Sequence, residues 1–240
     1  MRKIFFLLFA ITVTNTIWAQ SPLPKTKNDI TNLPNDHFMI QLSSDRWLGA
    51  PDSIDSHRKG FSRGANIYLM VNKPFKNNSN FSAAFGIGVG TSNIFLDKMD
   101  ADIIGVTRVL KFNSLDTLER FKKYKMSTSF LEIPIELRFY SNPKNPNKSF
   151  KVAVGVKVGT LLNAHVKGKT LQNAAGATIV DYTQKLASRS YFNTTRLAAT
   201  VRIGYANFSA FGSCNITSIF KDNVAANMSL LQFGLSFSGL

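Results

Sequence analysis

Residues 130–139 read FLEIPIELRF, with a large apolar side chain at every second position. The charged residues of this stretch stand between the apolar ones. Successive side chains of an extended strand point to opposite faces. The stretch therefore predicts a β-strand with one apolar face, made by Leu131, Ile133, Ile135, Leu137 and Phe139, and one face that carries Glu132, Glu136 and Arg138.

The same period of two recurs along the chain. It is strong over residues 66–71, 81–90, 150–159, 196–205 and 231–237, and weaker over 38–42 and 209–219. Together with 130–139, these segments make eight candidate strands, and the good ones have about the 9 to 12 residues with which a tilted strand crosses a bilayer. The sequence predicts an all-β fold, an eight-stranded antiparallel transmembrane β-barrel.

The expected connections alternate between long and short. The long ones cover residues 45–61, 93–126, 169–186 and 220–227, and the short ones cover 74–80, 141–148 and 206–207. Short turns at one rim and long loops at the other are typical of outer-membrane barrels. Aromatic residues flank the short turns, which predicts an interfacial girdle of Phe75, Phe81, Phe139, Tyr140, Phe150, Tyr205, Phe208 and Phe237.

A soluble barrel shows the same period of two, so the choice between a membrane barrel and a soluble barrel depends on the chemistry of the two strand faces. The apolar face of the strong segments carries no charge, whereas the opposite face mixes Gly, Ala and Ser with ionised side chains. Small residues suit the narrow interior of an eight-stranded barrel. We therefore expect the apolar face to contact lipid, with a soluble exported barrel that binds an apolar ligand as an alternative.

The start of the chain has the layout of a secretory signal. Arg2 and Lys3 precede an apolar run from Ile4 to Ala10, and cleavage is expected after Ala19. We expect a signal peptide over residues 1–19, an N-terminal periplasmic tail over 20–35 and the barrel over 36–240. This organisation predicts export to the cell outer membrane.

The chain is strongly basic, with 29 Lys and Arg against 14 Asp and Glu and a net charge of +15. Such an excess favours phosphate-bearing partners, and export favours membrane lipid over nucleic acid. Many basic residues fall at the long-loop rim, where we expect lipopolysaccharide phosphates to bind; the alternative is that they only keep the loops soluble. The candidate rim is Arg46, Arg63, Lys122, Lys123, Lys125, Lys167, Lys169 and Arg189.

The charges on the inward faces predict a second feature, an ion-pair network that fills the lumen. Its candidate members are Glu132, Glu136, Arg138, Lys151, Lys157, Arg196 and Arg202. An isolated buried charge is costly, so acids and bases of neighbouring strands are expected to pair. A polar pathway that acts as a small channel is the alternative.

No pattern of a catalytic or metal site is found. His37, His57 and His165 lack ligand spacing to one another or to a carboxylate cluster. The glycine repeat at 86–90 lies inside a strand with no helix after it, unlike a nucleotide-binding loop. Cys214 is the one cysteine, so an intrachain disulfide is excluded. We expect no enzyme activity, no metal and no cofactor.

Several short stretches carry a family resemblance. They are residues 130–138, the glycine-rich residues 84–90, AVGVKVG at 153–159, and Phe233-Gly234-Leu235. With the signal peptide, they resemble the outer-membrane β-barrel family of Bacteroidetes, the PorT-like group. The resemblance spans nearly the whole mature chain, and it implies an outer-membrane location and a role in assembly of the type IX secretion system.

These observations lead to one functional expectation. The protein is expected to be a monomeric outer-membrane barrel with a structural or interaction role, whose partners are outer-membrane lipid, lipopolysaccharide, and secretion-system or other envelope proteins. An outer-membrane lipid-modifying enzyme is a further alternative, although no nucleophile, base and orienting acid stand at a recognisable spacing.

Overall fold

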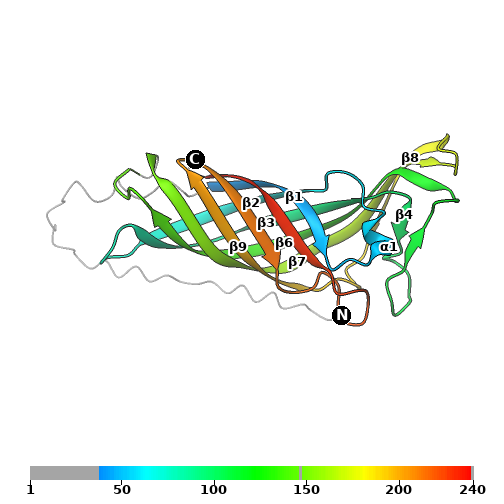
Figure 1. The fold of residues 1–240 in the computed structure, drawn as a ribbon. Helices are drawn as coiled ribbons and strands as arrows, with labels where there is room; N and C mark the ends of the chain where they lie inside the picture. Colours follow the sequence, from blue (N-terminus) through cyan, green and yellow to red (C-terminus); the bar gives the residue numbers. More distant parts are fainter. Residues whose placement is uncertain (1–37, 146–147, 239–240) are drawn as a thin grey trace, which may run out of the picture. The chain divides into compact units, whose positions relative to one another are not determined.

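The computed structural model describes residues 38–145 and 148–238, in which eight strands close an antiparallel barrel (Figure 1). The expected signal peptide and periplasmic tail lie outside the described residues. Pairing of the first strand with the last closes the ring. The barrel strands are β1 (Phe38–Leu48), β2 (Arg63–Pro74), β3 (Phe81–Leu96), β6 (Arg120–Tyr140), β7 (Phe150–Gln172), β9 (Thr195–Tyr205), β10 (Phe208–Asn215) and β11 (Ser229–Ser238).

The two ends of the barrel differ as the alternating connections predict. The short turns 75–80, 141–149 and 206–207 share one end with the start of β1 and the end of β11. The long connections gather at the other end, together with the short helix α1 (Asp52–Asp55) and the small hairpin of β4 (Met99–Ala101) and β5 (Phe112–Ser114) (Figure 1). None of the helices in the described part of the chain is long and apolar enough to cross a membrane.

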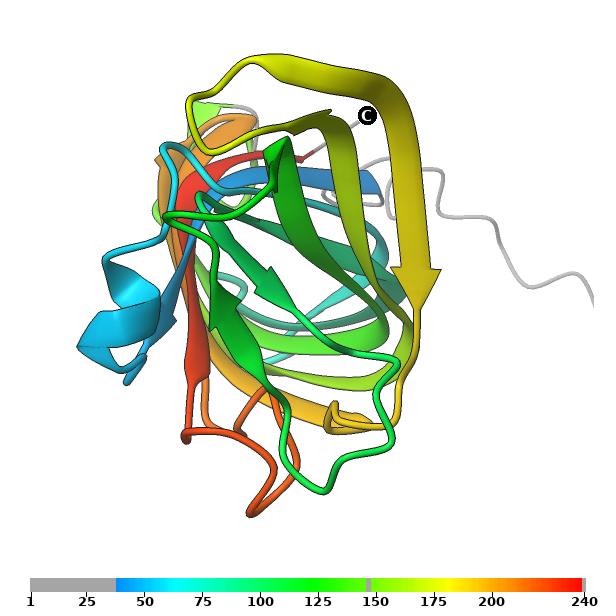
Figure 2. The same ribbon diagram turned by 90° about the vertical axis from the view of Figure 1, so that its right-hand side faces the viewer.

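Two of the expected loops contain long strand segments, so those predictions were wrong. Residues 169–186 were expected to be a loop, but β8 (Thr178–Ala187) pairs with the outer half of β7 and forms an arm beside the barrel (Figure 2). The inner half of β7 pairs with β9 instead. Nearly every residue of β8 is exposed, so this strand has no buried face to impose an alternating pattern. Strands β3 and β6 likewise extend into the expected loop 93–126.

The apolar face of each barrel strand points outward, as predicted. Large apolar side chains stand exposed at alternate positions, and Ile135 and Val154 are each 50% exposed. The small and charged residues between them are turned inward. An exposed apolar belt that runs around several strands is expected where the surroundings are hydrocarbon and not water.

Partway along the strands, the apolar residues move from the outward face to the inward face, and the polar residues move the other way. On β6 the outward positions change from isoleucine and leucine to Ser129, Lys125 and Lys123, while the inward positions change from glutamate to Phe130 and Met126. A register irregularity between β6 and β7 lies at the same point. Beyond it the barrel has an apolar interior and a polar exterior, as a protein in water does. The exchange therefore marks the outer edge of the apolar belt.

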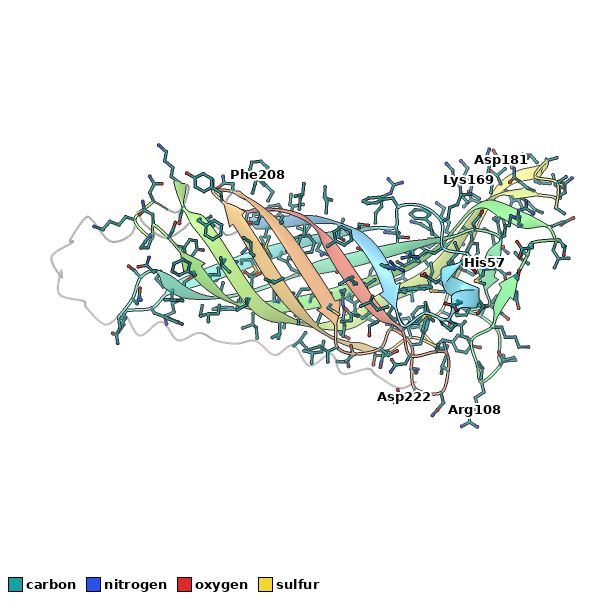
Figure 3. All side chains as sticks on the ribbon, viewed as in Figure 1. His57, Arg108, Lys169, Asp181, Phe208 and Asp222 are labelled. Carbon is teal, nitrogen blue, oxygen red and sulfur yellow. The ribbon has the colours of Figure 1, made fainter. Side chains whose placement is uncertain are left out.

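Aromatic side chains mark the opposite edge of the belt. The rings of Phe81 and Phe139 lie 5.3 Å apart between centroids, and those of Phe208 and Phe237 lie 5.1 Å apart. Figure 3 shows Phe208 at the short-turn end. These cross-strand pairs form part of the girdle that the sequence predicts for a membrane interface.

A charge placed in the middle of the belt tests its contact with hydrocarbon. We expect Ile135→Arg to lower the free energy of unfolding by about 2 to 4 kcal/mol, because a cation at the bilayer midplane loses its hydration. Tyr205→Arg, at the aromatic edge, is the matched control and should cost about 0 to 1 kcal/mol. Urea unfolding in lipid vesicles measures both. Equal losses at the two positions would contradict the outward assignment of the belt.

Candidate functional site

The inward face of β6 organises the lumen around Glu132. Its direct partners on the neighbouring strands are Gly88 on β3 and Gly159 on β7. A β-carbon added at Gly159 would lie 3.0 Å from the Cγ of Glu132, and one added at Gly90 would lie 2.7 Å from its Oε2. The glycines therefore leave the space into which the Glu132 side chain and its partners fit.

Glu132 is fully buried and contacts three strands. Arg196 of β9 donates from Nη1 to Oε1 of Glu132 at 2.7 Å. The hydroxyl of Tyr68 on β2 donates to Oε2, and the Nζ of Lys157 on β7 lies 3.9 Å from the same oxygen. Relative exposure is 0% for Glu132 and 2% for Arg196, so this ion pair is sealed from water.

Arg196 extends the contacts to the remaining side of the barrel. Its Nε donates to Oδ1 of Asn215 at 2.8 Å, and its Nη2 donates to Oε1 of Gln232 at 2.9 Å. The amide of Gln232 in turn donates to the carboxylate of Asp45 at 3.2 Å. We call these residues the lumen network; they come from seven of the eight barrel strands, and they are Asp45, Tyr68, Glu132, Lys157, Arg196, Asn215 and Gln232.

A second cluster lies nearer the short-turn end. Glu136 accepts hydrogen bonds at Oε2 from Nε of Arg138 at 2.8 Å and from Nη2 of Arg202 at 2.9 Å. Lys151 lies over the ring of Tyr140, with its Nζ 5.6 Å from the ring centroid. All of these side chains are buried. Six of the seven lumen residues predicted from the sequence thus form two ion-pair groups, one around Glu132 and one around Glu136. The seventh, Lys151, lines a small cavity with Arg138 and Arg202 of the second group.

Four members of the lumen network were not singled out from the sequence. Asp45, Tyr68, Asn215 and Gln232 are residue types that also occur on solvated surfaces. The signal that could have found them is their strand position, since all four have the same inward phase as the buried small residues of their strands.

Above the network, the lumen is closed by an apolar core that the sequence did not predict. Edge-to-face rings of Trp47, Phe112 and Phe220 join β1, β5 and the 216–228 connection, with centroids 6.2 to 6.4 Å apart. We call this the outer core; its most buried members include Ile103, Ala164, Phe192, Phe220 and Met228. Loops that look unstructured in sequence are therefore packed over the barrel mouth.

Polar contacts fasten the same loops to one another. The hydroxyl of Tyr191 donates to the carbonyl of Thr107 at 2.8 Å, and the amide of Leu110 donates to the carbonyl of Val224 at 2.9 Å. His57 lies 3.4 Å from the carboxylate of Asp116. Two hydrogen bonds lower the pKa of Asp116, the larger effect coming from Ser114 and the smaller from His57. The loops together form a fixed cap.

Little empty space remains beside the buried charges of the lumen. The cavity beside Arg196 and Phe130 has a volume of about 20 Å³, and that beside Arg138 and Arg202 about 10 Å³. Each holds about one water molecule. Within the described part of the chain, no three His, Cys, Asp or Glu side chains come together as metal ligands.

The predicted basic rim divides into members that come together and members that do not. Lys125 on β6 stands directly opposite Lys167 on β7, and Lys123 stands opposite Lys169. Arg63 on β2 stacks on Phe95, with its guanidinium carbon 5.7 Å from the ring centroid, on the same outward side.

The other three rim candidates lie elsewhere. Arg46 forms an ion pair with Asp55 at 3.3 Å. Lys122 alternates with Lys123 and so points to the opposite side of β6. Arg189 belongs to the connection between β8 and β9. These three positions do not join the group of basic residues on the outer wall.

Comparison with known proteins gives a family and, among the solved structures, the neighbour described below. The family described as outer membrane protein beta-barrel domain matches residues 32–221. The solved structure of Ail, the attachment invasion locus protein of Yersinia pestis, in complex with the heparin analogue sucrose octasulfate, is 11% identical. That comparison covers 84% of this chain and 94% of Ail with a TM-score of 0.33. No curated protein matches the chain.

The Glu132–Arg196 pair can be tested by a double-mutant cycle. We expect Glu132→Gln alone to lower the free energy of unfolding by about 3 to 5 kcal/mol, because it leaves Arg196 buried without its counter-charge. Arg196→Gln in the same chain should restore part of this loss, with a coupling energy of about 1 to 3 kcal/mol. Urea unfolding of the four variants in vesicles measures it. Strictly additive losses would show that the pair does not act as a unit.

Proposed function

This chain belongs to the outer membrane protein beta-barrel domain family, and we propose that it acts as a non-catalytic interaction protein that presents a fixed cap outside the outer membrane. The single observation that carries the proposal is the outer core. Twenty buried apolar residues join the strand ends to the long connections. A surface that is held in one arrangement binds a partner without first losing conformational entropy.

The lumen supports an interaction role over conduction. The lumen network crosses the barrel, and the outer core lies above it. An eight-stranded barrel is just wide enough for its own side chains to fill. A soluble apolar-ligand carrier is disfavoured as well, because the apolar residues of the belt point outward and would face water in a soluble protein.

The cap offers distinct surfaces to a partner. The β7–β8 arm, which carries Lys169 and Asp181, reaches to one side, and two loops at the same end of the barrel carry Arg108 and Asp222 (Figure 3). Tyr182 of β8 and Val106 of the 97–119 connection are exposed apolar side chains. Tyrosine is among the residue types that contribute most to protein–protein contacts, and Val106 adds exposed apolar area to the cap.

Electrical recording tests the closed lumen. We expect the purified protein, inserted into a planar bilayer, to give no discrete current steps, because charged and apolar side chains fill the barrel. A fluorescent label on the same protein serves as the control that insertion has occurred. Reproducible single-channel openings would contradict the closed lumen and favour the small-channel function.

Site-specific crosslinking in intact cells tests the interaction role. A photoreactive phenylalanine at Tyr182 or Val106 is expected to yield protein adducts, because both side chains are exposed on the cap. The same residue at Asn77, in a short turn at the other end, is the matched control. Adducts at Asn77 alone would move the interaction to the periplasmic end, and no adduct at any position would refute the proposal.

Assistance to protein secretion is a second, narrower proposal. It rests on the resemblance of residues 130–138 and 153–159 to the PorT-like group. Deletion of the gene, followed by profiling of secreted and surface proteins, tests it. Loss of proteins carried by the type IX system, restored by the intact chain, would support this role, and unchanged secretion would exclude it while leaving the interaction role standing.

A further inference from the structure

A row of cations crosses the outer wall of the barrel, just beyond the apolar belt. Lys125, Lys167 and Lys185 lie directly opposite one another on β6, β7 and β8. Neighbouring strands lie about 4.8 Å apart, so the three side chains leave the sheet within about 10 Å. The β8 arm is needed for this row, because it supplies Lys185.

Two further groups widen the row. Lys125 donates from Nζ to Oδ1 of Asn93 at 2.7 Å, and Asn93 stands opposite Arg63 on β2. Arg63 is thereby next to the row on the β3 side. On the outer side, Lys123 and Lys169 form a second pair two residues further along the same strands. The cations make a patch on one wall, not a random scatter over the loops.

The lysines of either row form no ion pair within the described part of the chain, whereas Lys59 and Lys98 of the cap each contact an aspartate. Lys125 lies beyond the membrane-spanning part of β6. Its pKa is lowered mainly by burial and, to a smaller extent, by the positive charges of Lys167, Lys185 and Arg63. Like charges directly opposite on paired strands destabilise a sheet. An external anion would relieve this repulsion.

We propose that Arg63, Lys125, Lys167 and Lys185 form a binding site for the phosphate groups of an outer-leaflet glycolipid. The site deepens the proposed function by naming a lipid partner, and it rests on the outer-membrane placement alone. A membrane lipid is the source because the row lies on the outward wall next to the belt, where acyl chains continue downward along Ile133 and Ile135. Several ammonium groups suit a headgroup with more than one phosphate.

Lipopolysaccharide with and without its phosphates provides the test. The full mature chain is unfolded by heat in uncharged maltoside micelles to which either lipid is added. The intact lipid is expected to raise the unfolding midpoint of the wild-type protein, and the dephosphorylated lipid to raise it much less. Equal effects of the two lipids would overturn the proposal.

Charge-removing variants locate the site. Lys125→Gln, Lys167→Gln and Lys185→Gln combined are expected to weaken binding of the intact lipid by about 100-fold. Lys73→Gln, Lys76→Gln and Lys144→Gln at the short-turn end remove the same charge and should leave binding within about twofold of the wild type. Equal weakening in both triple variants would show a non-specific effect of net charge and overturn the site.

The sign of the stability change separates binding from misfolding. In micelles without lipopolysaccharide, the first triple variant should unfold at the same or a higher temperature than the wild type, because three opposed charges are gone. A lower midpoint there would overturn the claim that the row is repulsive. Millimolar inorganic phosphate should stabilise the wild type far less than the intact lipid, and an equal effect would assign the site to free anions. Crosslinking at Tyr182 reports on the interaction role separately.

Discussion

The contact between Glu132 and Arg196 is the constraint on which the interior depends. Both side chains are out of water, which costs more than their attraction returns unless other groups satisfy them. Tyr68 and Lys157 satisfy the carboxylate, and Asn215 and Gln232 satisfy the guanidinium. This arrangement requires one register of the strands, because a slip of one residue would turn every inward charge toward the belt. The filled interior then leaves the outer surface as the place where the protein can act.

The exchange of faces along β6 explains how the same strands can face hydrocarbon within the belt and water beyond it. Within the belt the apolar residues point outward and the ions inward, and beyond Ser129 the order reverses without any break in the strand. The outer segment can therefore build an apolar core against Phe130 and Met126. This core holds the long connections in place, so the cap is a continuation of the barrel and not a set of loose loops. A partner outside the membrane meets a preformed surface.

The sequence predicted the eight strands and their outward faces because a period of two survives wherever one face meets hydrocarbon and the other a narrow lumen. It failed where that condition ends. Beyond Ser129 the apolar residues move to the other phase, so 93–126 looked like a loop, and β8 has no buried face at all. The partners of Glu132 were out of reach for a different reason: they depend on register between strands far apart in the chain, as for Gln232.

The same dependence on register separates the charges inside from those outside. Inside, Glu132 and Glu136 each meet arginine at hydrogen-bond distance, so the fold supplies its own counter-charges. On the outer wall it places three lysines from three strands at one level and supplies none. The residues opposite Lys167 on both neighbouring strands are lysines, whereas an acidic residue at either position would have formed an ion pair. Because each strand contributes only one member, the row depends on the register between strands, and no single stretch of sequence shows that its members stand at one level.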